Sequence, residues 1–219
     1  MIRLSAFRWV PPFAQGLVRD LRVRWALEEA ELPYEVMLIG FEDQKTESYR
    51  KLQPFGQVPA IDDNGLVLFE SCAIIMHLGE RSEALMPRDE AARARVRTWM
   101  LAALNTVEPP IMMLNYIEMQ PDGAQAGAKA VRDSIAAWIG MRLDTLGAFL
   151  GDREHLVEDR FTAAALLMTT VLRILRTTDL VEGRPALNAY KKRHEARPAF
   201  QKALAGQMEA FARNAPATT

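Results

Sequence analysis

The chain lacks the features that mark secreted, membrane-spanning or nucleic-acid-binding proteins. Its 219 residues include a single cysteine, so no internal disulfide can form, and we expect a reducing, cytoplasmic compartment. No apolar run approaches the length that spans a bilayer, and residues 1–10 lack the apolar core of a signal peptide. A net charge of -1 gives no electrostatic basis for binding nucleic acid or an anionic membrane.

The sequence is equally poor in motifs for metals and phosphates. Its three histidines, His77, His155 and His194, are scattered singly, without the spacing of metal ligands. No glycine-rich phosphate loop occurs, and we expect no bound metal. What is present is ordinary for a globular protein: 49% apolar and 25% charged residues, in a chain long enough for a substantial core and one or two domains.

Strand and helix patterns alternate over residues 1–82. The predicted elements, in order, are a strand at 2–7, a helix at 13–31, a strand at 34–39, a short helix at 47–52, two strands joined by Asn64-Gly65, and a helix ending near residue 80. The Asn-Gly pair tolerates the positive φ angles of a two-residue hairpin turn. The order βαβαββα predicts a mixed sheet with helices on both faces, as in a thioredoxin-like α/β domain.

The character of the chain changes near residues 81–88, after which no strand pattern follows. The predicted helices are 91–116, bent or interrupted at Pro109-Pro110, then 126–150, 162–172, 185–193 and 198–212. Residues 162–172 are apolar on nearly every side, which is typical of a helix at the centre of a bundle. We therefore expect an all-α helical bundle domain at 89–219 after the α/β domain at 1–82.

The segment from residue 57 to residue 71 is the most informative part of the chain. Pro59 has no N–H, so it begins a strand or lies at an edge, and it leaves the backbone groups of Val58 free to pair with something else. Glu70 and Ser71 precede an apolar run and so occupy the N-terminus of a helix, where exposed N–H groups attract anions. Together these residues predict a peptide-sized site with an edge for backbone pairing and a pocket for a carboxylate.

Motifs along essentially the whole chain resemble those of the glutathione transferase superfamily. The matching segments are RVRWALEE at 22–29, LQPFGQVP at 52–59, LFESCAI at 68–74, FTAAALL at 161–167 and EARPAF at 195–200. Each piece alone is weak, but the ordered set is specific. The chain resembles a bacterial-type member of the superfamily, of a class that the residues do not assign.

The resemblance implies that glutathione lies extended along the edge beside Pro59, whose preceding peptide bond would be cis. Val58 would pair its backbone N–H and C=O with the cysteinyl unit, and Gln57 would add a contact. Ser71 and the helix N–H groups would hold the γ-glutamyl carboxylate, while Glu70 would pair with the α-ammonium group. For the glycyl carboxylate the choice stays open among Lys45, Arg50 and Lys51.

The group that activates the glutathione sulfur is missing by every alignment of the motifs. Family members usually place Tyr, Ser or Cys just after the first strand, but here Pro11 stands there and proline donates nothing. The shorter spacing of the serine class leads to Leu17 or Val18, which are equally inert. The candidates that remain are backbone N–H groups at a helix start near Phe13 and Ala14, helped by Trp9, Arg8 or Arg19.

A second, apolar site for the electrophile is expected where the first long helix of the helical domain faces the sheet domain. The candidates on that helix are Trp99, Met100, Met112, Met113 and Tyr116, with Trp9 and Phe13 opposite. Methionine adapts its shape and suits a site of broad selectivity. For each single residue the alternative is simple packing in the core.

Three functions are compatible with the fold that these residues predict. The first is a cytoplasmic, homodimeric glutathione transferase in detoxification, which delivers the glutathione thiolate to a small hydrophobic electrophile, a peroxide or a mixed disulfide. The second is a transferase-like protein that binds ligands or proteins with little catalysis. The third, an oxidoreductase using Cys72, is disfavoured because the chain has no second cysteine, and we expect Cys72 to be buried and structural.

Overall fold

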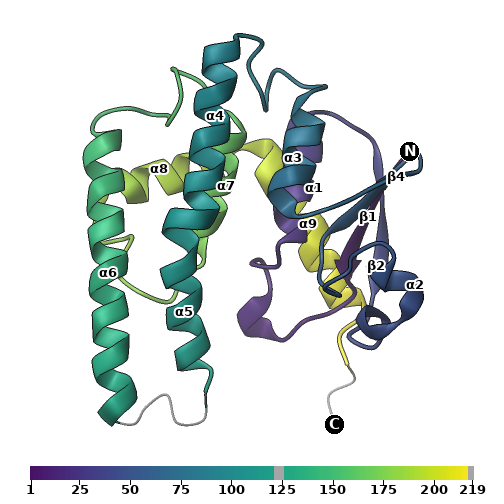
Figure 1. Ribbon diagram of the computed structural model, residues 1–219, viewed down its shortest axis with the longest axis horizontal. Helices are drawn as coiled ribbons and strands as arrows, with labels where there is room; N and C mark the ends of the chain where they lie inside the picture. Colours follow the sequence, from purple (N-terminus) through teal and green to yellow (C-terminus); the bar gives the residue numbers. More distant parts are fainter. Residues whose placement is uncertain (121–125, 217–219) are drawn as a thin grey trace. The chain divides into compact units, whose positions relative to one another are not determined.

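The computed structural model describes residues 1–120 and 126–216, which belong to two compact units (Figure 1). The sheet unit comprises Met1–Arg88 and the segment from Ala196 onward, and the helical unit comprises Asp89–Glu195. The last helix, which follows Ala196, packs against the sheet unit and belongs to it. This division therefore differs from the sequence-based domains 1–82 and 89–219 in that element.

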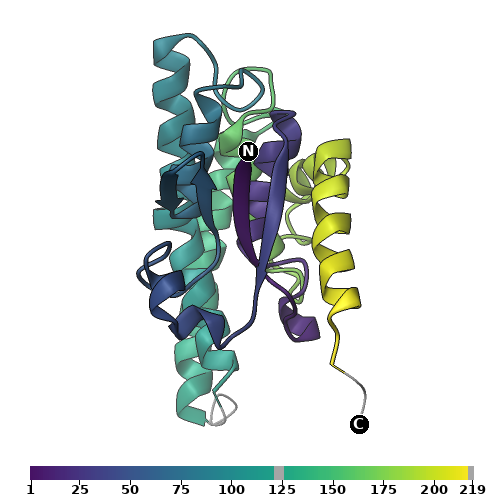
Figure 2. The same cartoon turned by 90° about the vertical axis from the view of Figure 1, so that its right-hand side faces the viewer.

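The sheet unit is built on four strands with the order β2-β1-β3-β4. The strands are β1 (Ile2–Phe7), β2 (Tyr34–Ile39), β3 (Ala60–Asp63) and β4 (Leu66–Phe69). Strand β1 runs parallel to β2, as Figure 2 shows, and antiparallel to β3, which pairs with β4 in a hairpin. With the helices α1 (Asp20–Glu29), α2 (Glu47–Arg50) and α3 (Ser71–Gly79), the predicted thioredoxin-like order βαβαββα is confirmed.

Helix α1 begins later than the sequence pattern predicts. The predicted start near residue 13 is wrong, because Pro12–Ala14 form a 3₁₀ turn and Gln15 is extended with ψ 133°. Gly16 then turns the chain with a φ of 74°, which a residue without a Cβ adopts readily. The apolar spacing of Leu17, Leu21 and Trp25 suggested one continuous helix, but the break after Ala14 shows that the first of these precedes the helix.

Helix α9 (Pro198–Arg213) packs along α1 within the sheet unit. The ring of Trp25, fully buried on α1, meets Phe200 of α9 with 4.8 Å between ring centroids. Arg197, just before α9, holds both carboxylate oxygens of Glu29 at 2.6 and 2.8 Å. An aromatic contact and a bidentate ion pair therefore fix the start of α9 against the end of α1.

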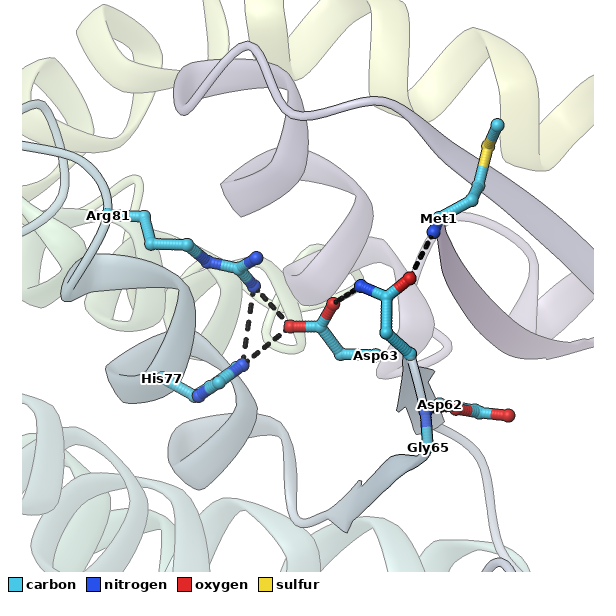
Figure 3. Close-up of polar contacts among 7 residues, drawn as sticks. Met1, Asp62, Asp63, Gly65, His77 and Arg81 are labelled. Carbon is cyan, nitrogen blue, oxygen red and sulfur yellow. Dashed lines mark hydrogen bonds and ion pairs between the residues drawn. The ribbon is translucent and has the colours of Figure 1, made fainter.

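Asp63, the last residue of β3, ties the hairpin to helix α3 (Figure 3). Its carboxylate accepts hydrogen bonds from Arg81 Nη2 at 2.5 Å and Asn64 Nδ2 at 2.9 Å, and it lies 2.8 Å from His77 Nε2. The contact with His77 and the guanidinium of Arg81 lower the pKa of Asp63. Asn64 and Gly65 have φ angles of 54° and 94°, so the predicted Asn-Gly hairpin turn is present.

The helical unit follows after Arg88. Its helices are α4 (Glu90–Ala102), the π-helical turn η3 (Ala103–Val107), α5 (Glu108–Glu118), α6 (Ala126–Leu150), α7 (Ala163–Arg173) and α8 (Pro185–Glu195). The predicted single helix at 91–116 is interrupted by η3, just before Pro109-Pro110, where the prolines cannot donate to the preceding turn. Helix α7 is buried from Ala163 to Leu172, as its apolar composition predicts. Within the described ranges, no helix combines the length and hydropathy needed to cross a membrane.

Candidate functional site

The residues before β3 form an edge with unpaired backbone groups. The Val58–Pro59 peptide bond is cis, as the family resemblance implies. The side chain of Val58 is buried with Ile39 and Tyr49, whereas Gln57 is exposed. Within residues 1–120 and 126–216, no group hydrogen-bonds to the backbone N–H or C=O of Val58. Such an edge is where an extended peptide can add as a further strand.

The β3–β4 hairpin brings this edge to the start of helix α3. Ala60, which follows Pro59, is the register partner of Phe69, which precedes Glu70. Because paired residues of an antiparallel ladder lie about 4.5–5.5 Å apart, the two flanking segments meet at the same end of the hairpin. The predicted site residues before β3 and after β4 are therefore neighbours in the structure.

Ser71 is the first residue of helix α3 and is 4% exposed. The first N–H groups of a helix have no acceptor within it, and they favour anions. Arg22, buried on α1, directs its Nη1 at the Ser71 hydroxyl oxygen, 3.5 Å away. A helix N-terminus, a hydroxyl and a guanidinium therefore gather at one point, which suits a carboxylate.

Glu70 presents its carboxylate beside this anion site. Its side chain is exposed, makes no cap to α3 and forms no ion pair with any residue that the structure describes. Its backbone has φ 69° and ψ 114°, a conformation that costs a non-glycine residue about 1–3 kcal/mol. The arrangement places an unpaired negative group next to a positive one, as the recognition of an α-amino acid requires.

The three cations considered for the glycyl carboxylate differ in how they are engaged. Arg50 donates from Nη1 to the carbonyl of Pro54 at 3.2 Å, and Lys51 pairs with Glu47 at 2.9 Å. Lys45 is exposed at the end of the 3₁₀ turn Asp43–Lys45, and its ammonium group contacts no partner within the described residues. Lys45 is thus the cation whose charge is available to a ligand.

The segment after β1 does not supply a helix start at Phe13 and Ala14. Because α1 begins at Asp20, the prediction that their N–H groups lie at a helix N-terminus is wrong, and the N–H of Ala14 donates to the carbonyl of Pro11 at 2.9 Å. The ring of Phe13 is 62% exposed. Arg8 pairs with Asp43 at 2.8 Å. Trp9 is half-buried, and Arg19 is the half-buried residue before α1.

A buried polar cluster anchors the end of this segment. Asp20 accepts from Arg24 Nε at 2.7 Å and from Gln207 Nε2 of α9 at 2.7 Å, and all three side chains are buried. Gln207 also donates to the carbonyl of Val18 at 3.3 Å. Burial raises the pKa of Asp20, and Arg24 partly offsets this effect. The segment that should carry the activator is therefore held in place at its end.

Cys72 is buried, as predicted for a structural cysteine. Burial raises the pKa of its thiol to about 11, even though the positive charge of Arg22 acts in the opposite direction. A reactive cysteine needs a lowered pKa, because the thiolate is the nucleophile. This environment argues against an oxidoreductase that uses Cys72.

The candidates for the electrophile site separate into core and surface residues within the helical unit. Met100 is fully buried and packs the core, and the ring of Trp99 contacts that of Phe149 in a tilted arrangement with 4.5 Å between ring centroids. Met112, Met113 and Tyr116 on α5 are 38%, 48% and 69% exposed. Spacings of three and four residues place Tyr116 beside both methionines on the helix surface. These three remain candidates for contact with an apolar ligand.

Two buried hydroxyls near the edge were not among the sequence-based candidates. Ser5 in β1 and Tyr49 in α2 are buried and 2.8 Å apart. A serine in an otherwise apolar strand was the available signal, but its partner lies 44 residues away. Among the described residues, no group of histidine, cysteine and acidic side chains is arranged to hold a metal ion.

Comparison with known proteins gives the family. The sequence profile described as "Glutathione S-transferase, N-terminal domain" matches residues 15–80. A glutathione S-transferase of Hyoscyamus muticus is 30% identical over 194 residues, which cover 84% of this chain and 92% of that protein. Glutathione S-transferase 3 of Zea mays is 31% identical over 196 residues, covering 84% of this chain and 88% of that protein. Both are plant proteins, so the bacterial type suggested by the motifs stays a prediction.

Solved structures agree with this result. A glutathione transferase from Burkholderia graminis, with two glutathione molecules bound per subunit, has a TM-score of 0.80 and 26% identity, covering 93% of this chain and 87% of that one. Glutathione transferase F7 from Populus trichocarpa has the same fold, with a TM-score of 0.79, 23% identity and coverage of 96% and 99%. The chain therefore belongs to the glutathione S-transferase family.

Proposed function

We propose that this protein binds reduced glutathione and transfers its thiolate to a small hydrophobic electrophile. The observation that carries the proposal is the unpaired backbone of Val58, which lies at the same end of the hairpin as the free carboxylate of Glu70 and the N-terminus of α3. A tripeptide with an amino-acid group at one end matches this combination of an edge and a charged pocket.

Each site residue has one role in this proposal. The N–H and C=O of Val58 pair with the cysteinyl unit, and cis Pro59 shapes the edge. The hydroxyl of Ser71 and the first N–H groups of α3 bind the γ-glutamyl carboxylate, with Arg22 adding positive charge. Glu70 pairs with the α-ammonium group, and the amide of Gln57 contacts the ligand from the rim.

For the glycyl carboxylate we choose Lys45 over Arg50 and Lys51. The side chains of Arg50 and Lys51 already bond to Pro54 and Glu47. Moving either cation to the ligand would break an existing contact, whereas Lys45 has none to lose among the described residues. Lys45→Ala is therefore expected to weaken glutathione binding more than Lys51→Ala does.

The transfer step needs the thiolate of glutathione. A free thiol has a pKa of about 8.5, so a donor near the sulfur must stabilise the anion for the reaction to run fast at neutral pH. The thiolate attacks the electrophilic carbon, a C–S bond forms, and the leaving group departs with its electron pair. The donors that remain as candidates are the indole N–H of Trp9 and the guanidinium of Arg19.

Weak activation follows from Pro11 at the position of the usual hydroxyl or thiol. Loss of one donor of this kind typically lowers a rate by about 10²–10³-fold. The rate of conjugation is then expected to rise with pH through about 8.5, where a free thiol is half ionised, and to level off only above that pH. If the conjugation rate instead reaches its plateau near pH 6.5, the pKa of the bound thiol is strongly lowered. That result would demonstrate a stronger activator than we expect of Trp9 or Arg19.

Pro11 at the activator position also supports a second candidate function. In this alternative the protein binds glutathione with little turnover and serves as a ligand- or protein-binding module. Pro11 removes the donor and leaves every proposed binding group in place. Homodimer formation, a cytoplasmic location and a role in detoxification belong to the first candidate and are proposed with it.

Calorimetric titration with glutathione, combined with a conjugation assay on 1-chloro-2,4-dinitrobenzene, distinguishes the candidates. Binding with turnover above the uncatalysed rate supports the transferase, and binding without turnover supports the binding module. No heat of binding at millimolar glutathione would contradict both. A Cys72→Ala variant with unchanged turnover excludes the oxidoreductase.

A further inference from the structure

A chain of buried hydroxyls lies beneath the edge that carries Val58 and Pro59. Tyr49 Oη lies 2.7 Å from the carbonyl oxygen of Gln57, and 2.8 Å from Ser5 Oγ. The Ser5 hydroxyl in turn accepts the N–H of Ala60 at 2.7 Å. Ser5 is fully buried and Tyr49 is 4% exposed, so both hydroxyls are shielded from water.

The chemistry of the two ends fixes the direction of every hydrogen bond. The carbonyl of Gln57 only accepts, so Tyr49 must donate its single proton to it. The amide of Ala60 only donates, so Ser5 accepts there and uses its own proton to donate to Tyr49. The three hydrogen bonds therefore run from Ala60 through Ser5 and Tyr49 to Gln57, with one possible arrangement of protons. We call this series of hydrogen bonds the relay.

This relay holds the loop on both sides of the cis peptide bond. Gln57 precedes Val58-Pro59 and Ala60 follows it, so the relay joins the two flanks of the segment to strand β1 and helix α2. Buried hydrogen bonds in a chain strengthen one another, and breaking one leaves the next group unsatisfied. The hydrogen bonds to Gln57 and Ala60 thus hold the backbone of Val58 in a defined position, although Val58 itself makes no hydrogen bond to Ser5 or Tyr49.

We propose that Ser5 and Tyr49 are positioning residues that set the affinity for glutathione by fixing the Val58 edge. The inference rests on the proposed binding of glutathione at this edge. Neither hydroxyl reaches a ligand in this account; each acts through the backbone of Gln57 or Ala60. Burial also raises the pKa of Tyr49, which keeps the phenol protonated, as donation to Gln57 requires.

Tyr49→Phe tests the proposal, with Tyr34→Phe as its matched control. Tyr34 lies on β2 in the same unit, and its hydroxyl donates to Glu28 at 3.0 Å, away from the edge. Each variant loses one hydroxyl: Tyr49→Phe loses the hydrogen bonds to Gln57 and Ser5, and Tyr34→Phe loses the hydrogen bond to Glu28. We expect Tyr49→Phe to raise the Kd for glutathione roughly three- to tenfold, and Tyr34→Phe to leave it unchanged, at a similar loss in melting temperature. Equal Kd values for the two variants would overturn the proposal.

Ser5→Ala supplies a second test, whose first readout is independent of glutathione. Amide hydrogen exchange followed by NMR on the full chain reports on the N–H of Ala60, which loses its acceptor in this variant. Exchange at Ala60 that is at least several-fold faster than in the wild type, together with a raised Kd, supports the relay. Unchanged exchange at Ala60 overturns it, even if the Tyr49→Phe variant fails to fold.

The wild type separates failure of this inference from failure of the proposed function. If the wild-type protein shows no affinity for glutathione, the proposed function and the positioning role are both contradicted. If it binds and the Tyr49→Phe and Ser5→Ala variants bind equally tightly, only the positioning role falls. A double variant whose Kd rises by less than the product of the two single changes would show that the hydroxyls act as one unit.

Discussion

The sheet edge and the segment after β1 are both parts of the same unit, yet they differ in what they offer a ligand. The edge presents the unpaired backbone of Val58, the free carboxylate of Glu70 and the N-terminus of α3. The segment from Arg8 to Arg19 has Pro11 where the family resemblance leads us to expect a hydroxyl or thiol, and its short turn uses the N–H of Ala14 internally. The sheet edge has groups that can bind a ligand, whereas the segment after β1 lacks the hydroxyl or thiol that family members usually have there.

Under the proposed function, recognition of glutathione and activation of its sulfur would depend on separate parts of the fold. The proposed binding groups are the backbone at Val58 and the N-terminus of α3, which the β3–β4 hairpin brings together. The family resemblance places the activator in a single side chain after β1, so one substitution could remove it without disturbing the edge. Asp20 nevertheless fixes the end of the segment through its hydrogen bonds with Arg24 and Gln207. The missing activator is therefore a matter of residue type at Pro11, and the segment is not poorly anchored at that end.

The largest effect is expected from Asp20→Ala, which tests whether the segment is truly anchored. The substitution leaves the buried guanidinium of Arg24 without its carboxylate, and breaking a buried pair in this way costs about 3–5 kcal/mol. Urea unfolding measures the loss. Glu209→Ala, which removes an exposed pair with Arg213 on α9, is the control and should cost no more than about 0.5 kcal/mol. Equal stability of the two variants would show that Asp20 does not anchor the segment.

Ser71→Ala and Glu70→Gln come next and test the binding side of the comparison. Each removes a charge-assisted contact to the amino-acid end of glutathione, worth about 1.5–3 kcal/mol, so the Kd should rise about ten- to hundredfold. Calorimetry measures the change. Ser48→Ala and Glu35→Gln, exposed positions elsewhere in the same unit, should bind like the wild type. Wild-type affinity in both site variants would remove Glu70 and Ser71 from the site.

Pro11→Ser tests the chemical side by offering a hydroxyl where the family usually has one. We expect turnover of 1-chloro-2,4-dinitrobenzene to rise about tenfold, because a donor near the sulfur stabilises the thiolate. The Kd for glutathione should not change. Pro11→Ala removes the ring without adding a donor and separates the hydroxyl from the loss of proline. Similar turnover in the two variants would mean that Pro11 does not occupy the activator position.

The smallest effect concerns the acid stability of the hairpin that supports the edge. The pKa of Asp63 is lowered in the folded protein, so its contribution to stability is present above the unfolded value of about 3.9 and is lost as the pH falls. Asp63→Asn should therefore melt about 2 °C lower than the wild type at pH 7, and the difference should shrink toward pH 3. Calorimetric melting curves measure it, and a constant difference at every pH would contradict the account.

Local chemistry made much of the fold predictable. The Asn64-Gly65 turn, the strand after Pro59 and the buried helix α7 depend on residues that are close in sequence. The start of α1 was missed because apolar spacing continued backward through Leu17, while Gln15 and Gly16 took non-helical angles. Amphipathic spacing also cannot name the partner of a helix, so the packing of α9 on α1 was not foreseen.

The candidate site was predictable to the same degree. Its edge and helix start follow from proline, serine and their place in a motif, whereas its supports join residues far apart in the chain. Ser5 and Tyr49 are 44 positions apart, and Arg22 and Ser71 are 49 positions apart. No local pattern reveals such pairs.

The most direct measurement is an NMR titration of the isotope-labelled protein with reduced glutathione, which follows individual backbone amides. If the tripeptide adds as a strand, the amide of Val58 shifts strongly and becomes protected from exchange, and the amides of Ser71 and Cys72 shift with it. Saturable binding that leaves these three amides unperturbed, while others move, would contradict the account.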